Sequence, residues 1–355
     1  MDEIEGRLLR LLEELTRWER GRIDLRRGAL GALLVVLPLV IGYLVGLAEA
    51  AVLVSVGALN LLLVEAPKPG RTPGRTLLVA VGVNAVAFGA GTIVGLLPRL
   101  VELPFVAVGI FVALLGSRWA TWQNASFIAA VMFVFAVGVP PTTEIGILLR
   151  PSAVLLGGVW VVSTLAVLNM LRSSPERDVF SPPVPSPRID LASSRARNRH
   201  AAAVAITATA GLWLGLVLGL PRDYWVMLTV LVALRPDLAA TVSYSASRGA
   251  GTVVGAAGAF AVTTLTSSPG ILFPVLGATT WLALATRSVN YLVYAVGITL
   301  TVILLLNLAY SGGPSLAVTR VIDTVIGGAL ALVAAFLLFE VGLAKRSSGS
   351  AGRTS

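Results

Sequence analysis

Residues 289–310 read VNYLVYAVGITLTVILLLNLAY, a stretch that contains no charged side chain. A helix rises about 1.5 Å per residue, so a stretch of this length spans roughly 30 Å, the thickness of the hydrocarbon core of a bilayer. A second stretch, residues 145–171, is interrupted by only one charge, that of Arg150. Uncharged apolar segments of this length predict transmembrane helices.

The composition of the whole chain also indicates that lipid surrounds it. Of the 355 residues, 56% are hydrophobic and 13% are charged, about half the charged share of a soluble domain. The sequence has no cysteine and a single histidine, His200, which excludes disulfide frameworks, thiolate catalysis and metal sites built from Cys or His. It has no GxxxxGKS or GxxxxGKT motif, so the chain is not itself a P-loop ATPase. We expect neither an enzyme nor a cofactor.

Twelve apolar segments are candidates for spanning helices, and the second and eighth of them are short. They are residues 28–47, 49–64, 76–97, 101–117, 122–140, 145–171, 200–220, 223–235, 249–267, 270–286, 289–310 and 317–341. The predicted fold class is therefore all-α, a polytopic membrane protein.

Positive charges are distributed unevenly between the loops of this arrangement. With the N-terminus inside, 23 of the 27 Lys and Arg residues lie on the inner side, and four lie outside: Arg99, Arg150, Arg222 and Arg320. This bias follows the positive-inside rule and predicts a multi-pass protein of the cell membrane with both termini in the cytoplasm. The bias also explains the net charge of +9, so we do not expect nucleic acid as a partner.

Three polar segments flank or divide the apolar ones. Residues 1–27 lack a small-residue cleavage site, and their apolar residues form one helical stripe, which predicts an amphipathic helix on the inner membrane surface or, alternatively, a dimer-forming helix. Residues 172–199 carry five Pro and six Arg and predict an extended cytoplasmic linker. Residues 342–355 predict a disordered cytoplasmic tail.

The linker separates two similar halves, residues 28–171 and 200–341. Matching residues recur in order at separations of 166 to 173 positions: Arg27 and Arg199, Gly42-x-x-x-Gly46 and Gly215-x-x-x-Gly219, Arg75 and Arg248, Pro104 and Pro274, Arg118 and Arg287, Asn124 and Asn290, and Arg150…Gly157-Gly158 and Arg320…Gly327-Gly328. We predict two parallel six-helix repeats related by a pseudo-twofold axis along the membrane normal.

The second half carries a distinctive set of motifs. It runs Tyr224-Trp225, Leu234-Arg235-Pro236-Asp237, Arg248-Gly-Ala-Gly251-Thr252 and Arg320-Val-Ile-Asp323-Thr324-Val-Ile-Gly327-Gly328. This set resembles the fusaric acid resistance protein-like family, which includes bacterial exporters of aromatic carboxylates and is related to the plant aluminium-activated malate transporters. The resemblance implies six-helix membrane units that move organic anions. Larger members carry a cytoplasmic domain after each unit, whereas this chain has only the linker and the tail there.

Arg150 and Arg320 are the strongest candidates for substrate binding. A charged residue at the centre of a bilayer costs about 2.5–3.5 kcal/mol, so it needs a partner or a watery cavity. A guanidinium group can form two parallel hydrogen bonds with a carboxylate, and two arginines at equivalent positions would face each other near the axis. Alternatively, each side chain extends to the lipid headgroups, or Arg320 forms a structural pair with Asp323, three residues further along the same helix.

Five further residues are candidates for the substrate site. Asp323 would be a proton-coupling group, unless it only pairs with Arg320; the first half has Ala153 at the matching position. Tyr224 and Trp225 would stack on an aromatic substrate, or they belong to an interfacial aromatic belt. Asn124 and Asn290 would line an inner vestibule, or they form hydrogen bonds between helices.

These features predict an exporter of small organic anions that is driven by an ion or potential gradient. One alternative is a passive organic-anion channel of the malate-transporter type, and another is a membrane scaffold subunit that transports nothing. The expected partners are the anion and the lipid bilayer. Self-association and an envelope adaptor protein are left open.

Overall fold

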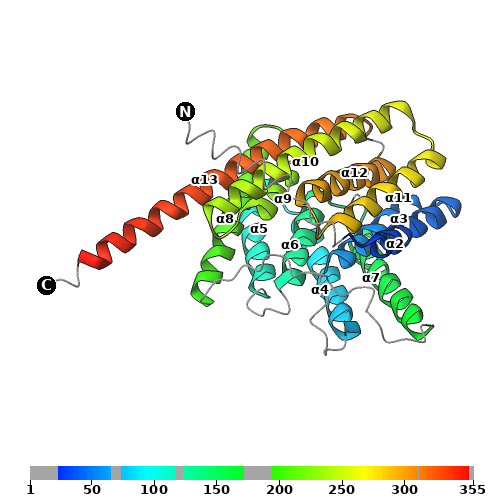
Figure 1. Cartoon of the computed structure of the whole chain (residues 1–355), viewed down its shortest axis with the longest axis horizontal. Coiled ribbons are helices and arrows are strands. Elements are labelled where there is room, and N and C mark those ends of the chain that lie inside the picture. Colours follow the sequence, from blue (N-terminus) through cyan, green and yellow to red (C-terminus); the bar gives the residue numbers. More distant parts are fainter. Residues whose placement is uncertain are drawn as a thin grey trace.

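The structure, a computed structural model, describes residues 23–64, 73–116, 123–141, 143–171, 194–310 and 312–351. The described ranges form twelve helices, one at each predicted apolar segment (Figure 1). They are α2 (Leu25–Leu44), α3 (Ala48–Leu63), α4 (Pro73–Val94), α5 (Arg99–Leu115), α6 (Gln123–Gly138), α7 (Gly146–Met170), α8 (Ser194–Val217), α9 (Tyr224–Ala233), α10 (Leu238–Leu265), α11 (Pro269–Thr286), α12 (Tyr291–Tyr310) and α13 (Ser315–Ala351). The all-α class is confirmed.

Seven of the helices are long and apolar enough to cross a bilayer, namely α2, α4, α7, α8, α11, α12 and α13. The chain is therefore a multi-pass membrane protein. The shorter apolar helices include α3, α6 and α9. Of the twelve predicted candidate segments, seven thus form helices that are long and apolar enough to span, within the described part of the chain.

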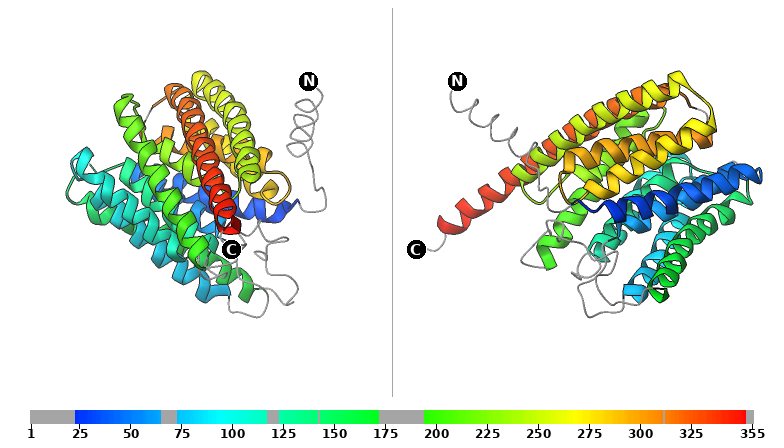
Figure 2. Two further views of the ribbon diagram at one scale, coloured as in Figure 1. Left: turned by 90° about the vertical axis from the view of Figure 1, so that its left-hand side faces the viewer. Right: turned by 45° about the vertical axis from the view of Figure 1, so that its right-hand side comes forward.

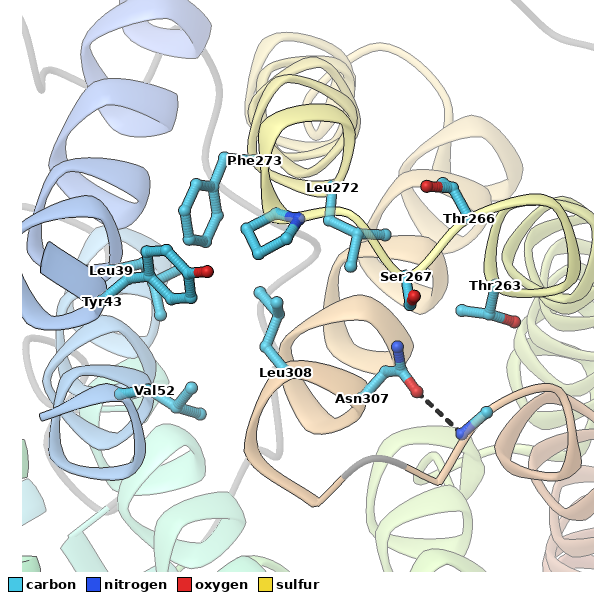
Figure 3. A pocket seen from close by; sticks show the side chains of 13 residues that line it. Leu39, Tyr43, Val52, Thr263, Thr266, Ser267, Leu272, Phe273, Asn307 and Leu308 are labelled. Carbon is cyan, nitrogen blue, oxygen red and sulfur yellow. Dashed lines mark hydrogen bonds between the residues drawn. The ribbon is translucent and has the colours of Figure 1, made fainter. Parts of the chain in front are cut away.

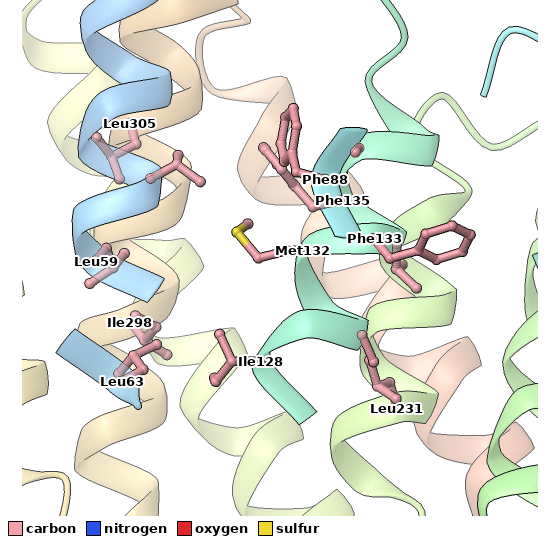
Figure 4. Close-up of a cluster of buried hydrophobic side chains, with 14 of the residues drawn as sticks. Leu59, Leu63, Phe88, Ile128, Met132, Phe133, Phe135, Leu231, Ile298 and Leu305 are labelled. Carbon is pink, nitrogen blue, oxygen red and sulfur yellow. The ribbon is translucent and has the colours of Figure 1, made fainter. Parts of the chain in front are cut away.

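The short helices pack mainly against other helices. Side chains of α3, α6, α9 and α12 meet in one hydrophobic cluster that includes Leu59, Met132, Leu231 and Ile298 (Figure 4). Helix α9 contacts α6, α8 and α13, and α3 contacts α2, α7 and α12. Because these helices bury their side chains in protein, their length is not set by the thickness of the bilayer alone.

The turns that follow α2 and α8 are built in the same way. Gly46 has a φ of +75° and Gly219 a φ of +66°, in the left-handed region that favours glycine at the end of a helix. In both turns the N–H of the residue after the glycine donates to the carbonyl five positions earlier, at 2.7 and 2.9 Å. These hydrogen bonds satisfy carbonyl groups at the ends of α2 and α8. The tight turns let α3 and α9 begin a few residues later.

Glycines allow direct backbone contact where α7 crosses α3 and where α13 crosses α9. A Cβ atom on Gly157 of α7 would overlap the carbonyl oxygen of Val54 on α3. A Cβ atom on Gly327 of α13 would lie 2.7 Å from the carbonyl oxygen of Val226 on α9. Small residues at such crossings let membrane helices approach closely.

The two halves make corresponding internal contacts and also contact each other. In the first half α4 contacts α6 and α7, and in the second half α10 contacts α12 and α13. Between the halves, α5 contacts α8 while α11 contacts α2, and α6 contacts α9 while α12 contacts α3. Figures 1 and 2 show the two halves side by side.

Three predicted boundaries differ in the structure by six residues or more. Helix α10 begins at Leu238, eleven residues before the predicted start of its segment at residue 249. Helix α8 begins at Ser194, six residues before the predicted start of the second repeat. Helix α13 continues to Ala351 and projects beyond the other helices (Figure 2), where the sequence predicts a disordered tail from residue 342. No proline follows Ser315, so no residue of that kind stops the helix. The predicted N-terminal helix up to residue 22 and the linker from 172 to 193 lie outside the described residues.

Candidate functional site

Arg150 lies near the start of α7 and is buried, with 6% of its surface exposed. Its Nη1 donates to the carbonyl oxygen of Val139, and its Nη2 donates to the hydroxyl of Tyr310 at 3.2 Å. The same Nη2 lies 3.5 Å from a carboxylate oxygen of Glu49. The guanidinium group therefore points into the protein, which contradicts the alternative that it extends to the lipid headgroups.

Arg320, on α13, is buried to a similar degree, with 4% of its surface exposed. Its guanidinium carbon lies 5.0 Å from the centre of the Trp225 ring on α9, a cation–π contact. Its Nη1 has no hydrogen-bond partner among the described residues. Arg320 thus also points into the protein, and part of its donor capacity is unused.

Asp323 is completely buried, one helical turn after Arg320. Neither of its carboxylate oxygens has a hydrogen-bond partner in the part of the chain that the structure describes. The predicted structural pair between Asp323 and Arg320 is therefore not formed as a hydrogen bond. Removing one partner from a buried charge pair costs about 3–5 kcal/mol, so an ionised Asp323 without a partner would be expensive.

Arg222 connects the two candidate arginines. Its guanidinium carbon lies 5.8 Å from the centre of the Tyr310 ring and 5.6 Å from the centre of the Trp225 ring. Because Tyr310 bonds Arg150 and Trp225 contacts Arg320, these residues form one continuous chain of contacts. We call Arg150, Arg222, Trp225, Tyr310 and Arg320 the outer cluster, because the charge distribution in the sequence predicts that its three arginines lie on the outer side.

Tyr224 and Trp225 are both almost completely buried at the start of α9. The Tyr224 hydroxyl accepts a hydrogen bond from Nη1 of Arg222 at 3.4 Å. The Tyr224 ring meets Phe135 edge to face, with centres 6.1 Å apart. These positions contradict the alternative of an interfacial aromatic belt, because both rings lie within the helix packing.

Arg99, a fourth arginine next to the outer cluster, is paired with acids. Nη1 of Arg99 lies 3.1 Å from Glu102, and its Nη2 lies 3.8 Å from Asp223. Asp223 precedes α9, and its carboxylate accepts the N–H of Tyr224 at 2.8 Å. Arg99 is about half exposed, unlike the arginines of the outer cluster.

Asn124 and Asn290 are not brought to the outer cluster. Asn290 lies just before α12, and its side-chain oxygen accepts the N–H of Val293 at 3.1 Å, so it caps that helix. Tyr310, a member of the outer cluster, ends the same helix. Asn124 is likewise near the start of α6 and is half-buried. A role for these two residues in an inner vestibule stays a prediction.

Sequence reasoning did not single out Arg222, Tyr310 or Glu49. Arg222 had one usable signal, because it is one of the four arginines assigned to the outer side and directly precedes the Asp223-Tyr224-Trp225 motif. Tyr310 and Glu49 had no signal in the sequence, since their role depends on contacts with Arg150 across 160 and 101 positions of the chain.

A cavity of about 320 Å³ lies between the two halves. Leu39, Tyr43 and Val52 of α2 and α3 line one side of it, and Thr263, Ser267 and Asn307 line the other (Figure 3). Neither Arg150 nor Arg320 lines this cavity. The prediction that the two guanidinium groups share one water-accessible passage stays a prediction.

Comparison with known proteins confirms the family resemblance over the second half. Residues 207–334 match the profile of the family described as fusaric acid resistance protein-like. Inner membrane protein YccS of Escherichia coli (strain K12) is 35% identical over 136 residues, 38% of this chain and 19% of YccS. Uncharacterized protein ORF2 of Neisseria gonorrhoeae is 32% identical over 141 residues, 40% of this chain and 34% of ORF2.

A third relative, the uncharacterized protein YhfK of Escherichia coli (strain K12), is 27% identical over 175 residues, 47% of this chain and 25% of YhfK. The matched region thus spans between about a fifth and a third of the length of these relatives. No solved structure matches the chain.

Proposed function

We propose that the chain is a membrane transporter that exports small organic anions, with Arg320 and Arg150 as the residues that bind them. The observation that carries this proposal is the convergence of Arg150, Arg222 and Arg320 on the rings of Tyr310 and Trp225. Neighbouring guanidinium groups repel one another strongly in a medium of low dielectric constant, so an anion among them is stabilised. The unused Nη1 of Arg320 is a donor for its carboxylate.

Features that recur in the two halves support the proposal. Two similar units about a pseudo-twofold axis would each have one glycine turn and one glycine-mediated helix crossing, as the two halves do. They would also contact each other reciprocally, as α5 contacts α8 and α11 contacts α2. In such an arrangement Arg150 and Arg320 are equivalent. The surroundings of the two arginines then differ in one carboxylate, because Ala153 occupies the position in the first half that corresponds to Asp323.

The charge distribution supports an orientation with the outer cluster toward the outside and both termini in the cytoplasm. Arg150, Arg222 and Arg320 belong to the outer cluster, and Arg99 reaches Asp223 beside it. These are the four arginines that the positive-inside count assigns to the outer side. In a cell membrane with a negative interior, the potential assists the exit of an anion by about 2.3 kcal/mol per charge per 100 mV.

Flux through liposomes that contain the purified protein tests the proposal. We expect saturable efflux of a panel of aromatic and aliphatic carboxylates, with protein-free liposomes as the control. Slow, saturable turnover supports a carrier, whereas ohmic single-channel currents in a planar bilayer support the channel alternative. A well-folded protein that moves none of these anions would leave only the scaffold alternative.

Asp323→Asn is expected to remove the pH dependence of anion flux. An ionised Asp323 competes with the substrate for Arg320, whereas a protonated one does not, so wild-type flux should fall by up to about tenfold per pH unit above the titration of Asp323. Asn keeps the size of Asp and stays neutral, so the variant should keep the high rate. Flux would be measured with equal pH on both sides, over about three pH units.

Glu102→Gln is the matched control for this prediction. Glu102 is also completely buried, but one of its oxygens is paired with Arg99. This variant should keep the pH profile of the wild type. An Asp323→Asn variant with an unchanged pH profile would contradict a role for Asp323 in the transport cycle.

A further inference from the structure

A second group of cations and rings lies at the opposite ends of α9 and α12 from the outer cluster. Arg235 follows α9, and its guanidinium carbon lies 3.9 Å from the centre of the Tyr244 ring on α10. The Tyr244 ring lies 4.8 Å from the ring of Tyr291 at the start of α12, and Tyr291 lies 5.8 Å from Tyr294. One cation and three rings from three elements therefore adjoin one another.

Close packing of α10 on α12 holds these rings in place. A Cβ atom on Gly251 would lie 2.5 Å from that of Ala295, and one on Gly255 would lie 2.7 Å from the carbonyl oxygen of Val296. The two helices therefore run in the same direction with their backbones in contact. Arg248 lies one turn before Gly251 on α10. We call Arg235, Tyr244, Ser245, Arg248 and Tyr291 the inner cluster.

The loop that carries Arg235 is also held firmly. The backbone N–H of Arg235 donates to the hydroxyl of Thr241 at 3.0 Å. The side chain of Asp237 caps α10 by accepting the N–H of Ala240 at 2.7 Å. Arg235 is thus presented to Tyr244 by a turn whose backbone hydrogen bonds are satisfied.

The inner cluster contains buried donors that the rest of the described chain does not satisfy. Nε of Arg235, Nε of Arg248, the hydroxyl of Ser245 and the hydroxyl of Tyr291 are buried and have no hydrogen-bond partner there. A buried polar group without a hydrogen-bond partner is destabilising, because it has lost its hydrogen bonds to water. Arg235 and Tyr291 are joined through the Tyr244 ring, and Ser245 and Arg248 follow Tyr244 within about one turn of α10. All four groups can donate and two belong to cations, so they fit a ligand that brings acceptors and negative charge.

We propose that the inner cluster is a second binding site, which takes the carboxylate of an aromatic acid on Arg235 and Arg248 and its ring against Tyr244 and Tyr291. The role of this site in transport rests on the proposed function, since the site would hold the anion before its transfer to Arg320. Arg248 and Tyr291 lie close enough to Arg320 to interact with it electrostatically. The chemistry of the site, however, depends only on the inner cluster.

Calorimetric titration of the full-length protein in lipid nanodiscs tests the site, in an Arg320→Gln background that weakens the outer cluster. The probes are benzoate, cyclohexanecarboxylate, which lacks the aromatic ring, and benzyl alcohol, which lacks the charge. We expect benzoate to bind at least about tenfold more tightly than the other two. Binding of benzoate no tighter than that of both other probes would overturn the proposal.

Variants separate the ring from the charges. The double variant Arg235→Gln/Arg248→Gln should weaken benzoate binding by about tenfold or more, because it removes both charge-assisted hydrogen bonds to the carboxylate. Tyr291→Leu should bring the affinity for benzoate down to that for cyclohexanecarboxylate. Arg26→Gln, which removes an exposed cation from the start of α2, is the matched control and should change neither affinity.

The two proposals fail in different ways. Unchanged benzoate affinity in the folded double variant would overturn the inner site even if wild-type liposomes transport anions. Wild-type liposomes without flux would contradict the proposed function, whereas benzoate binding that depends on the inner cluster would still support the site. If the double variant does not fold, the benzoate affinity of Tyr291→Leu tests the inner site instead, because this variant leaves both cations in place. An unchanged affinity would then overturn the site.

Discussion

Arg320→Gln is expected to lower anion flux by about 10-fold to 100-fold. The variant removes a charge-assisted hydrogen bond worth about 1.5–3 kcal/mol, and each 1.4 kcal/mol corresponds to about a factor of ten. Arg320→Lys should recover part of the flux, because an ammonium group keeps the charge but not the planar pair of donors that matches a carboxylate. The measurement is the initial rate of efflux from liposomes that contain equal amounts of each protein.

Two controls separate binding from folding in this experiment. Arg99→Gln removes a half-exposed arginine that is paired with Glu102 and Asp223, so its flux should stay near that of the wild type. The double variant Arg320→Gln/Asp323→Asn should be as slow as Arg320→Gln, which would show that an unpaired Asp323 does not cause the loss. Wild-type flux in folded Arg320→Gln would contradict the anion site.

Gly57→Val is expected to destabilise the protein by about 3 kcal/mol or more. A Cβ atom on Gly57 of α3 would overlap the carbonyl oxygen of Val154 on α7, and Gly157 makes the reciprocal contact with Val54. A backbone oxygen within a helix cannot rotate away, so the two helices would have to separate. Inserting extra carbon atoms into a packed interior typically costs about 1–3 kcal/mol, and more where the obstacle is rigid.

Thermal unfolding of the purified protein, followed by tryptophan fluorescence, measures this effect. Gly82→Ala on α4 is the matched control, because a Cβ atom there meets nothing within 4 Å. Its melting temperature should be equal to that of the wild type or slightly higher, since alanine favours a helix over glycine by about 1 kcal/mol. Equal melting temperatures for Gly57→Val and the wild type would contradict the close crossing of α3 and α7.

The spacing of charged residues along a helix did not predict the contacts of the buried charges correctly. Arg320 and Asp323 are three positions apart, which predicts a pair on one face of α13. In the structure Arg320 lies against Trp225 of α9, and neither oxygen of Asp323 has a hydrogen-bond partner among the described residues. The Trp225 ring lies next to Arg320 because α13 packs directly on α9 at Gly327, and the local sequence does not encode this contact.

Three properties of this protein could be predicted from its amino-acid sequence: it is helical, it passes the membrane several times, and its second half resembles the fusaric acid resistance protein-like family. These properties are local, since a backbone in lipid must satisfy its own hydrogen bonds, and an apolar run of sufficient length therefore becomes a helix. Arg150 and Arg320 were recognisable for the same reason, as charges within or beside apolar segments.

The residues that surround those arginines could not be predicted, because they come from distant parts of the chain. Tyr310 reaches Arg150 across 160 positions of the chain, and Arg222 joins the rings of Tyr310 and Trp225 from a loop. Tyr224 and Trp225 are buried because α9 lies among α6, α8 and α13. Contacts between distant segments depend on how helices pack side by side, and helix packing is set by the shapes of whole surfaces and not by the spacing of residues along one helix.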